Sequence, residues 1–263
     1  MPRYFIEVSY KGTAYSGFQI QQNGITIQSE IQKALTIYFK QSFSLTGSSR
    51  TDAGVHALQN YFHFDTDNPL PLKKSLKKTI TEPRDHNAET KGGSALYNLN
   101  AILPNDIVIK KIFQVNNDAH CRFDAISREY QYLVYSHKDP FLLDKAYYFP
   151  YYLDKEKLNE AAGIFLEYGD FTSFSKRNTQ VNNFICRIEK SEWIIEENLL
   201  VYNVKANRFL RGMVKGLVGT MLRVGTGKIS LDELHRIINR RDCTQADFSV
   251  PPHGLFLVEV NFG

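Results

Sequence analysis

The chain has 263 residues, of which 43% are hydrophobic and 23% are charged, and its formal net charge is +4 at pH 7. This apolar fraction is sufficient for the core of one large domain or of two ordinary ones. The mild positive charge is compatible with an acidic partner such as nucleic acid, without requiring one. Cys121, Cys186 and Cys243 are widely spaced and form no CxxC pair, which argues against a zinc site or a disulfide framework and favours a reducing compartment.

No segment of the sequence is suited to crossing a membrane. The N-terminus alternates in polarity from its first residues and has no charged region followed by an apolar run, so we expect a strand there and no signal peptide. The most apolar window, residues 209–225, carries three basic residues and falls short of a membrane span. We therefore expect a protein of the cytoplasm with no membrane partner.

The first half of the chain is predicted to contain a strand, a helix and two further strands. Apolar residues alternate over residues 4–10 and recur every three or four positions over 27–38, where Thr26 can cap the helix. Short alternating patterns over 43–45 and 58–64 predict the other two strands. The side chains expected on one face of the last strand are Leu58, Asn60, Phe62 and Phe64.

The second half is predicted to begin near Ile107 with a strand. A strong strand pattern covers residues 128–136, and a helical pattern covers 155–168 with Asp154 as its N-cap. Two strand patterns on either side of residues 196–198 predict a β-hairpin.

Two helices and a strand complete the prediction. The first helix is expected over residues 208–223. Ser230 and Glu233 have the spacing of a capping box at the start of a second helix over 231–239. The chain then ends with a strand over 255–261.

This order of elements favours the α+β fold class. We expect two ferredoxin-like halves, residues 1–107 and 108–263, with mainly antiparallel sheets similar to split βαβ units. Residues 77–96 interrupt the first half, because they are polar, contain Pro83 and two glycines, and have no sustained period. We interpret them as an insertion whose lysine pairs form a solvated face.

The stretch GSSRTDAGVHA, residues 47–57, places Asp52 among small residues, with Arg50 before it and His56 after it. One interpretation is a β-turn in which the Asp52 carboxylate caps a backbone amide. Another is chemical: Arg50 and Asp52 could project to one side of an extended chain, and the guanidinium would keep the carboxylate ionised for nucleophilic or general-base work. A metal site built on Asp52 and His56 would lack a complete coordination set.

This stretch resembles the active-site motif G-R-T-D-A-G-V-H of the tRNA pseudouridine synthase A family. The resemblance covers nearly the whole chain apart from residues 77–96. The further matching blocks, in the family's order, are 10–35, 103–107, HCRFDAISREYQY (120–132), DFTSFSK (170–176), NRFLRGMVKGLVG (207–219) and GLFLV (254–258).

The resemblance implies a pseudouridine synthase fold, in which the two halves meet at a central catalytic cleft. It implies isomerisation of uridine to pseudouridine at positions 38, 39 and 40 of the anticodon stem-loop of tRNA, with no cofactor and no metal. Asp52 would be the essential carboxylate, and Arg50 would hold the displaced strand or its phosphates. The family also implies a homodimer whose subunits jointly hold one tRNA.

Three further residues match positions near the target base in the family. Tyr130, which could also be ordinary strand filler, would stack on the base and relay the proton from its C5 atom. Lys215, which could also belong to a solvated basic helix face with Arg211, stands where the family usually has arginine; a lysine can pair with Asp52 but cannot form a bidentate fork. Leu255 would contact the base or serve as a core residue.

The basic residues Arg3, Lys11, Lys176, Arg177, Arg208 and Arg211 could follow the RNA backbone. A rival interpretation is a non-catalytic or altered-target RNA-binding paralogue that keeps the fold. The insertion and Lys215 favour this rival, whereas intact Arg50, Asp52 and Tyr130 argue against it.

Overall fold

The computed structural model describes residues 1–22, 24–71, 95–177, 181, 183–196 and 198–263. Its strands form one nine-stranded sheet in the order β4-β1-β3-β9-β5-β8-β7, with β2 paired to β3 and β6 paired to β5. The strands are β1 (Arg3–Tyr10), β2 (Thr46–Gly47), β3 (His56–Asp65), β4 (Ile107–Val115), β5 (Ser127–Tyr135), β6 (Tyr147–Tyr148), β7 (Ile188–Glu196), β8 (Leu199–Ala206) and β9 (Leu255–Asn261). The α-helices are α1 (Ile27–Phe39), α2 (Ala95–Ile102), α3 (Lys155–Ile164), α4 (Met213–Gly225) and α5 (Leu231–Arg240).

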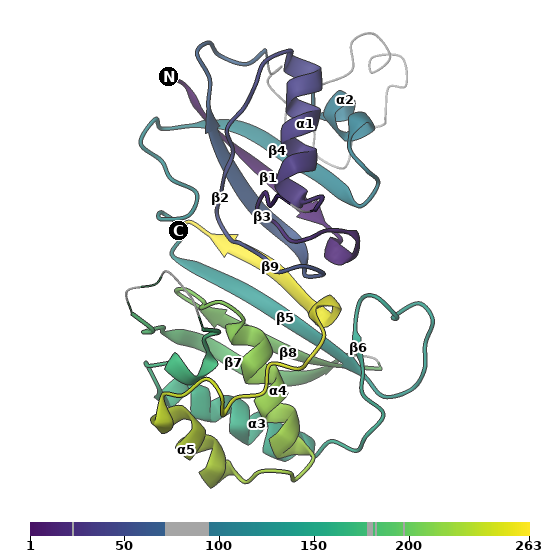
Figure 1. Ribbon diagram of the computed structural model, residues 1–263, viewed down its shortest axis with the longest axis vertical. Helices are drawn as coiled ribbons and strands as arrows, with labels where there is room; N and C mark the ends of the chain where they lie inside the picture. The colour runs from purple at the N-terminus through teal and green to yellow at the C-terminus, as the bar shows by residue number, and fades with distance from the viewer. Residues whose placement is uncertain (23, 72–94, 178–180, 182, 197) are drawn as a thin grey trace, which may run out of the picture.

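The α+β fold class is confirmed, but the two expected sheets are fused into one. Figure 1 shows α1 and α2 beside the strands of the N-terminal half, and α3, α4 and α5 beside those of the C-terminal half. The halves are joined by the last strand of the chain, because β9 pairs in parallel with β3 and antiparallel with β5. The division of the chain at residue 107 stays a prediction; β4, which begins there, pairs with β1.

The first strand and helix form as their patterns predict. The side chains of Tyr4, Ile6 and Val8 are buried on one face of β1. Thr26 caps α1: its hydroxyl accepts from the backbone N–H of Ser29, and the Ser29 hydroxyl accepts from that of Thr26. This reciprocal pair satisfies two amide groups that would otherwise lack partners at the start of the helix.

The prediction that Leu58 shares one face of β3 with Asn60, Phe62 and Phe64 is wrong. Val8 lies opposite Asn60 and Tyr10 lies opposite Ala57, so a bulge places an extra residue in β3. A bulge resets the alternation of side chains between the two faces of a sheet. Leu58 is therefore 47% exposed, and Ala57 takes the buried position.

Two other features of the N-terminal half differ from the prediction. Phe43 and Leu45 are buried without forming a strand, and the short strand β2 follows them. Helix α2 was not predicted, and its first two residues are the last two of the interpreted insertion 77–96. Residues 77–94 lie outside the described part of the chain.

The C-terminal half follows its prediction, with corrections at two helix starts. The β7–β8 hairpin and β9 form as expected, and Asp154 caps α3. Helix α4 begins at Met213 and not at 208, because Gly212 has a φ of 74°, outside the helical region. At α5, the Ser230 hydroxyl accepts from the Glu233 N–H, but the Glu233 carboxylate contacts Arg236, so only half of the capping box forms among the described residues.

We predict that protonation of His63 destabilises the fold. His63 lies on β3, is 6% exposed, and its Nδ1 accepts from the backbone N–H of Cys121. Burial, together with the charge of His120, lowers its pKa to about 4. The unfolded chain, whose histidines titrate near about 6.5, then binds more protons than the folded one between these values, so stability is lost as pH falls through this range.

The measurement is the free energy of unfolding at about pH 7 and about pH 5 for the wild type and for His63→Gln. We expect the variant to lose less stability between the two pH values. His137→Gln, a change of an exposed histidine, is the control and should keep the wild-type difference. An unchanged pH dependence in His63→Gln would contradict this account.

Candidate active site around Asp52

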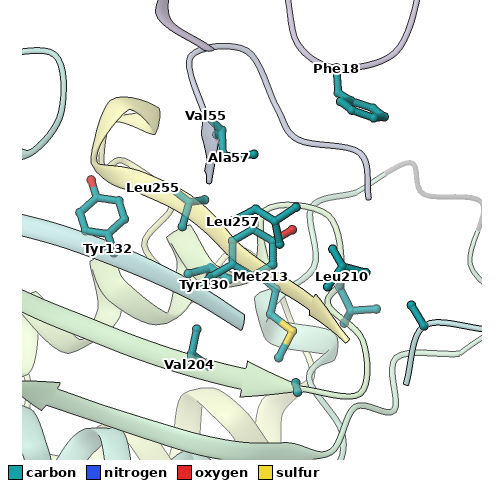
Figure 2. Close-up of a cluster of buried hydrophobic side chains, with 14 of the residues drawn as sticks. Phe18, Val55, Ala57, Tyr130, Tyr132, Val204, Leu210, Met213, Leu255 and Leu257 are labelled. Carbon is teal, nitrogen blue, oxygen red and sulfur yellow. The ribbon is translucent and has the colours of Figure 1, made fainter. Parts of the chain in front are cut away.

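One row of residues crosses the sheet where its two halves join. Tyr10 lies opposite Ala57, Ala57 opposite Leu257, Leu257 opposite Tyr130, and Tyr130 opposite Val204. Residues paired in this way direct their side chains to the same face of the sheet. Figure 2 shows Tyr130 and Leu257 grouped between the start of β3, with Val55 and Ala57, and the start of α4, with Met213.

Asp52 lies on the loop that leads into this row. Thr51 is buried and its hydroxyl hydrogen-bonds the Tyr10 hydroxyl at 2.8 Å, whereas Arg50 and Asp52 on either side of it are exposed. Asn60 donates to the Tyr10 hydroxyl at 3.1 Å and to the Ser49 carbonyl at 2.9 Å. This buried network holds the backbone on both sides of Thr51, so the Asp52 carboxylate is presented from a fixed loop.

The end of the loop is fixed by His56 and by two glycines. The His56 Nδ1 accepts from the Gly12 N–H at 3.0 Å, and its Nε2 donates to the His253 carbonyl at 3.0 Å. The ring is therefore neutral, and burial lowers its pKa. A Cβ on Gly12 would lie 2.0 Å from the Val55 carbonyl oxygen, and Gly54 has a φ of 78°, so both positions require glycine.

His56 serves the framework of the loop and is not free to ligate a metal. Both of its ring nitrogens are engaged with the backbone, as given above. In the described part of the chain, no group of three or more His, Cys, Asp or Glu side chains is arranged to hold a metal ion.

Tyr130 and Lys215 both lie within electrostatic range of Asp52. Burial raises the pKa of Tyr130 to about 12, and the charge of Asp52 adds to this rise. Burial and the charge of Lys176 lower the pKa of Lys215, and the charge of Asp52 opposes this effect. Among the described residues no ion pair within 4.0 Å joins Asp52 to a cation, so the carboxylate remains available to a ligand.

Lys176 completes a small positive region beside Asp52. Its backbone N–H donates to the Arg211 carbonyl at 3.0 Å, and its aliphatic chain crosses Gly212, where a Cβ would lie 3.0 Å from the Lys176 Cγ. From the sequence, Lys176 was predicted only as one of several residues that could contact the RNA backbone. Its proximity to Lys215 could not be predicted, because it depends on a loop that crosses the start of α4. No carboxylate among the described residues forms an ion pair with either lysine.

Leu255 begins β9 opposite Tyr132 and is 7% exposed. Leu257, two residues later, is the residue directly beside Tyr130 in the sheet. The two positions could not be distinguished from the sequence, because the register between β5 and β9 contains a bulge near Tyr130.

Arg50 is an exposed residue of the loop that carries Asp52. It lines a cavity with Phe18, Gly47 and Arg122, and no ion pair joins it to Asp52. The interpretation that Arg50 keeps Asp52 ionised by direct pairing is therefore not supported by the geometry of these two side chains.

Two hydroxyl groups at the start of the loop lack partners. The side-chain oxygens of Ser48 and Ser49 are buried, and neither has a hydrogen-bond partner among the described residues. A buried unpaired hydroxyl costs free energy, so the loop carries a local energetic penalty next to Arg50.

Comparison with known proteins identifies the family of the chain. A family model described as tRNA pseudouridine synthase matches residues 166–263. The chain is 40% identical to the tRNA pseudouridine synthase A of Azobacteroides pseudotrichonymphae over 100% of this chain and 97% of that protein. It is 41% identical to that of Parabacteroides distasonis (100% and 96%) and 42% identical to that of Bacteroides fragilis (99% and 96%). The chain therefore belongs to the tRNA pseudouridine synthase A family, a family of isomerases.

We predict that Tyr10→Phe loosens the Asp52 loop. The change removes the hydroxyl that Thr51 and Asn60 share, so we expect the free energy of unfolding to fall by about 1 to 3 kcal/mol. Urea denaturation measures this loss. Tyr38→Phe, at a partly buried tyrosine for which no hydroxyl contact is seen in the described chain, is the matched control. Equal stability of the two variants would show that the hydrogen bonds of the Tyr10 hydroxyl do not stabilise the loop.

Proposed function

We propose that this chain isomerises uridine to pseudouridine in tRNA, with Asp52 as the essential carboxylate. The observation that carries the proposal is the placement of Asp52. It is an exposed carboxylate on a loop fixed by buried hydrogen bonds, within electrostatic range of Tyr130 and Lys215. The relatives named above, of which 96–97% is covered, support the substrate class.

The reaction needs few chemical groups. The N1–C1′ bond of the uridine breaks, the base turns, and a C5–C1′ bond forms; the proton leaves C5 and the base gains one at N1. Because substrate and product are isomers, no oxidant or energy source is consumed. Asp52 would act as a nucleophile on the base or sugar, or would remove a sugar proton.

Tyr130 has two roles in this proposal. Its ring lies on the sheet beside Leu257 and packs edge-on against Phe209, with ring centroids 4.9 Å apart, so it offers a rigid surface to a base turned out of its stack. Its phenol is protonated at neutral pH, since its pKa is about 12. No described residue hydrogen-bonds this hydroxyl. The hydroxyl would therefore act as a relay: it would accept the proton that leaves C5 and release its own proton.

Lys215 and Lys176 would supply the positive charge that holds Asp52 and a substrate phosphate. Two ammonium groups on separate elements can divide these tasks, whereas one guanidinium would perform both through a fork. Arg50 would hold the displaced strand, and Leu255 would contact the base.

The finer assignments rest on the motif resemblance. We propose the anticodon stem-loop, at positions 38, 39 and 40, as the target, and a homodimer that works in the cytoplasm. In the described chain no helix combines the length and apolarity needed to cross a membrane. A catalytically inactive RNA-binding paralogue is the second candidate, and Lys215 in place of arginine favours it.

The first test is Asp52→Asn. Asparagine keeps the shape of the side chain but cannot be an anionic nucleophile or base, so we expect loss of isomerisation with tRNA affinity within about threefold of the wild type at fixed salt. Tritium release from C5-labelled uridine measures turnover. Asp67→Asn, an exposed carboxylate beyond the far end of β3, should keep full activity. Substantial turnover by Asp52→Asn would remove this residue from the mechanism, and a wild type without turnover would favour the inactive paralogue.

The second test separates the two roles of Tyr130. Tyr130→Phe keeps the stacking ring and loses the phenol, so we expect turnover to fall by about 10²-fold or more with tRNA binding preserved. Single-turnover assays with saturating enzyme measure the chemical step. Tyr152→Phe, at a position 85% exposed, is the control. Wild-type turnover in Tyr130→Phe would leave stacking as the role of the residue.

A further inference from the structure

A cavity of about 210 Å³ lies on the Arg50 side of the Asp52 loop. Three segments form it: residues 18–28, which lead into the first turn of α1; residues 45–50, which contain β2 and Arg50; and the turn after β4 that carries His120. None of the described residues that line it is acidic. The lining residues are Phe18, Gln19, Gln28, Leu45, Thr46, Gly47, Arg50, His120, Arg122 and Phe123.

Phe123 gives the cavity an exposed aromatic surface. Its side chain is 73% exposed, yet its ring lies 4.2 Å from the His120 ring and 5.6 Å below the Arg122 guanidinium. The turn itself is held by its backbone: the N–H groups of Arg122 and Phe123 donate to the His120 Nδ1, and the His120 N–H donates to the Asp124 carboxylate. The ring is therefore a fixed platform whose exposure has no explanation in the packing of the core.

The polar groups around this platform suit a nucleotide. Arg50 and Arg122 supply two guanidinium groups for phosphate oxygens. The Gln19 amide is exposed and makes no hydrogen bond to a described residue, so its donor and acceptor can meet the edge of a base. An aromatic platform with flanking arginines is the arrangement that binds unstacked bases of single-stranded RNA.

The cavity is also at a suitable distance from the reacting base. Arg50 and Asp52 are two residues apart, on the exposed side of a segment whose middle residue, Thr51, is buried. Two residues of extended chain span about 7 Å. A strand that delivers its uridine to Asp52 therefore passes Arg50 with the adjoining nucleotide.

We propose that this cavity binds the base of the nucleotide next to the target uridine, stacked on Phe123, with Arg50 and Arg122 at the adjoining phosphates. The proposal rests on the proposed function and adds a second unstacked base to it. The enzyme would then hold the displaced strand at two successive bases, which fixes the direction in which the strand enters the site.

The test is a double-mutant cycle between protein and RNA. A stem-loop RNA of the anticodon arm is prepared intact, and with an abasic residue on either the 5′ or the 3′ side of the target uridine. Its dissociation constant is measured with the Asp52→Asn protein, which prevents turnover, with and without Phe123→Ala. The loss expected for one stacked base is about 5- to 150-fold for each single change. The cycle cancels effects on the free RNA and on the free protein.

We expect one of the two abasic positions to show coupling, so that its effect disappears in Phe123→Ala. Phe123→Trp should keep the affinity, and Phe141→Ala, at an exposed phenylalanine of another loop, should leave the cycle unchanged. Independent effects at both flanking positions, or no effect of Phe123→Ala, would overturn the proposal. If Phe123→Ala fails to fold, the same cycle with Phe123→Leu, which keeps an apolar side chain but lacks the aromatic ring, decides it with the same two outcomes.

Failure of this inference is distinguishable from failure of the proposed function. A wild-type protein that forms pseudouridine but shows no coupling at either flanking nucleotide contradicts only the second base site. A wild-type protein that forms no pseudouridine contradicts the proposed function.

Discussion

Strand β9 joins the two halves of the sheet through its parallel pairing with β3. His56 lies opposite Phe256, and Ala57 lies opposite Leu257. This short ladder turns two smaller sheets into one, and it sets the Asp52 loop beside Tyr130 of β5. The backbone of the joint is reinforced by the His56 ring, which reaches from Gly12 to the His253 carbonyl. Since only two residue pairs join β3 to β9, the hydrogen bonds of His56 help to hold the two halves in register.

Much of the fold follows from local patterns, and the errors have local physical causes. The strands β1, β5 and β9 and the helix α1 were predictable because each has a clear pattern of apolar residues in the sequence, although a bulge interrupts the pairing of β5 with β9. The face of β3 was predicted wrongly at Leu58, because a bulge cannot be seen in the alternation of apolar residues. The early start predicted for α4 ignored Gly212, whose left-handed backbone ends the preceding loop. The fusion of the two sheets could not be predicted from local patterns, because it depends on which strands pair at their edges.

At the site, residue identity was more predictable than residue geometry. The motif around Asp52 and the tyrosine of β5 were found from the sequence, and the structure brings both to the same region. The role expected of Arg50 in keeping Asp52 ionised stays a prediction: both side chains are exposed on either side of the buried Thr51, and no ion pair within 4.0 Å joins them. Lys176 and Phe123 were not singled out from the sequence, since the role of each depends on a residue of another segment that lies near it only in the folded chain. Lys176 acts on Lys215 across the start of α4, and Phe123 lies across a cavity from Arg50.

The position of β9 in the sheet has a consequence for how the chain acquires its shape. Its seven residues, Leu255–Asn261, come after all the other described strands in the chain, yet they occupy the centre of the sheet. The N-terminal strands β1, β3 and β4 can pair as soon as they leave the ribosome, but the edge of β3 that faces β9 stays open until β9 has been synthesised. Closing the sheet requires contacts that are far apart in sequence, which is the slow kind of contact in folding. A chain that stops early would thus present Asp52 without its partner strand, so that a truncated product would lack the assembled site.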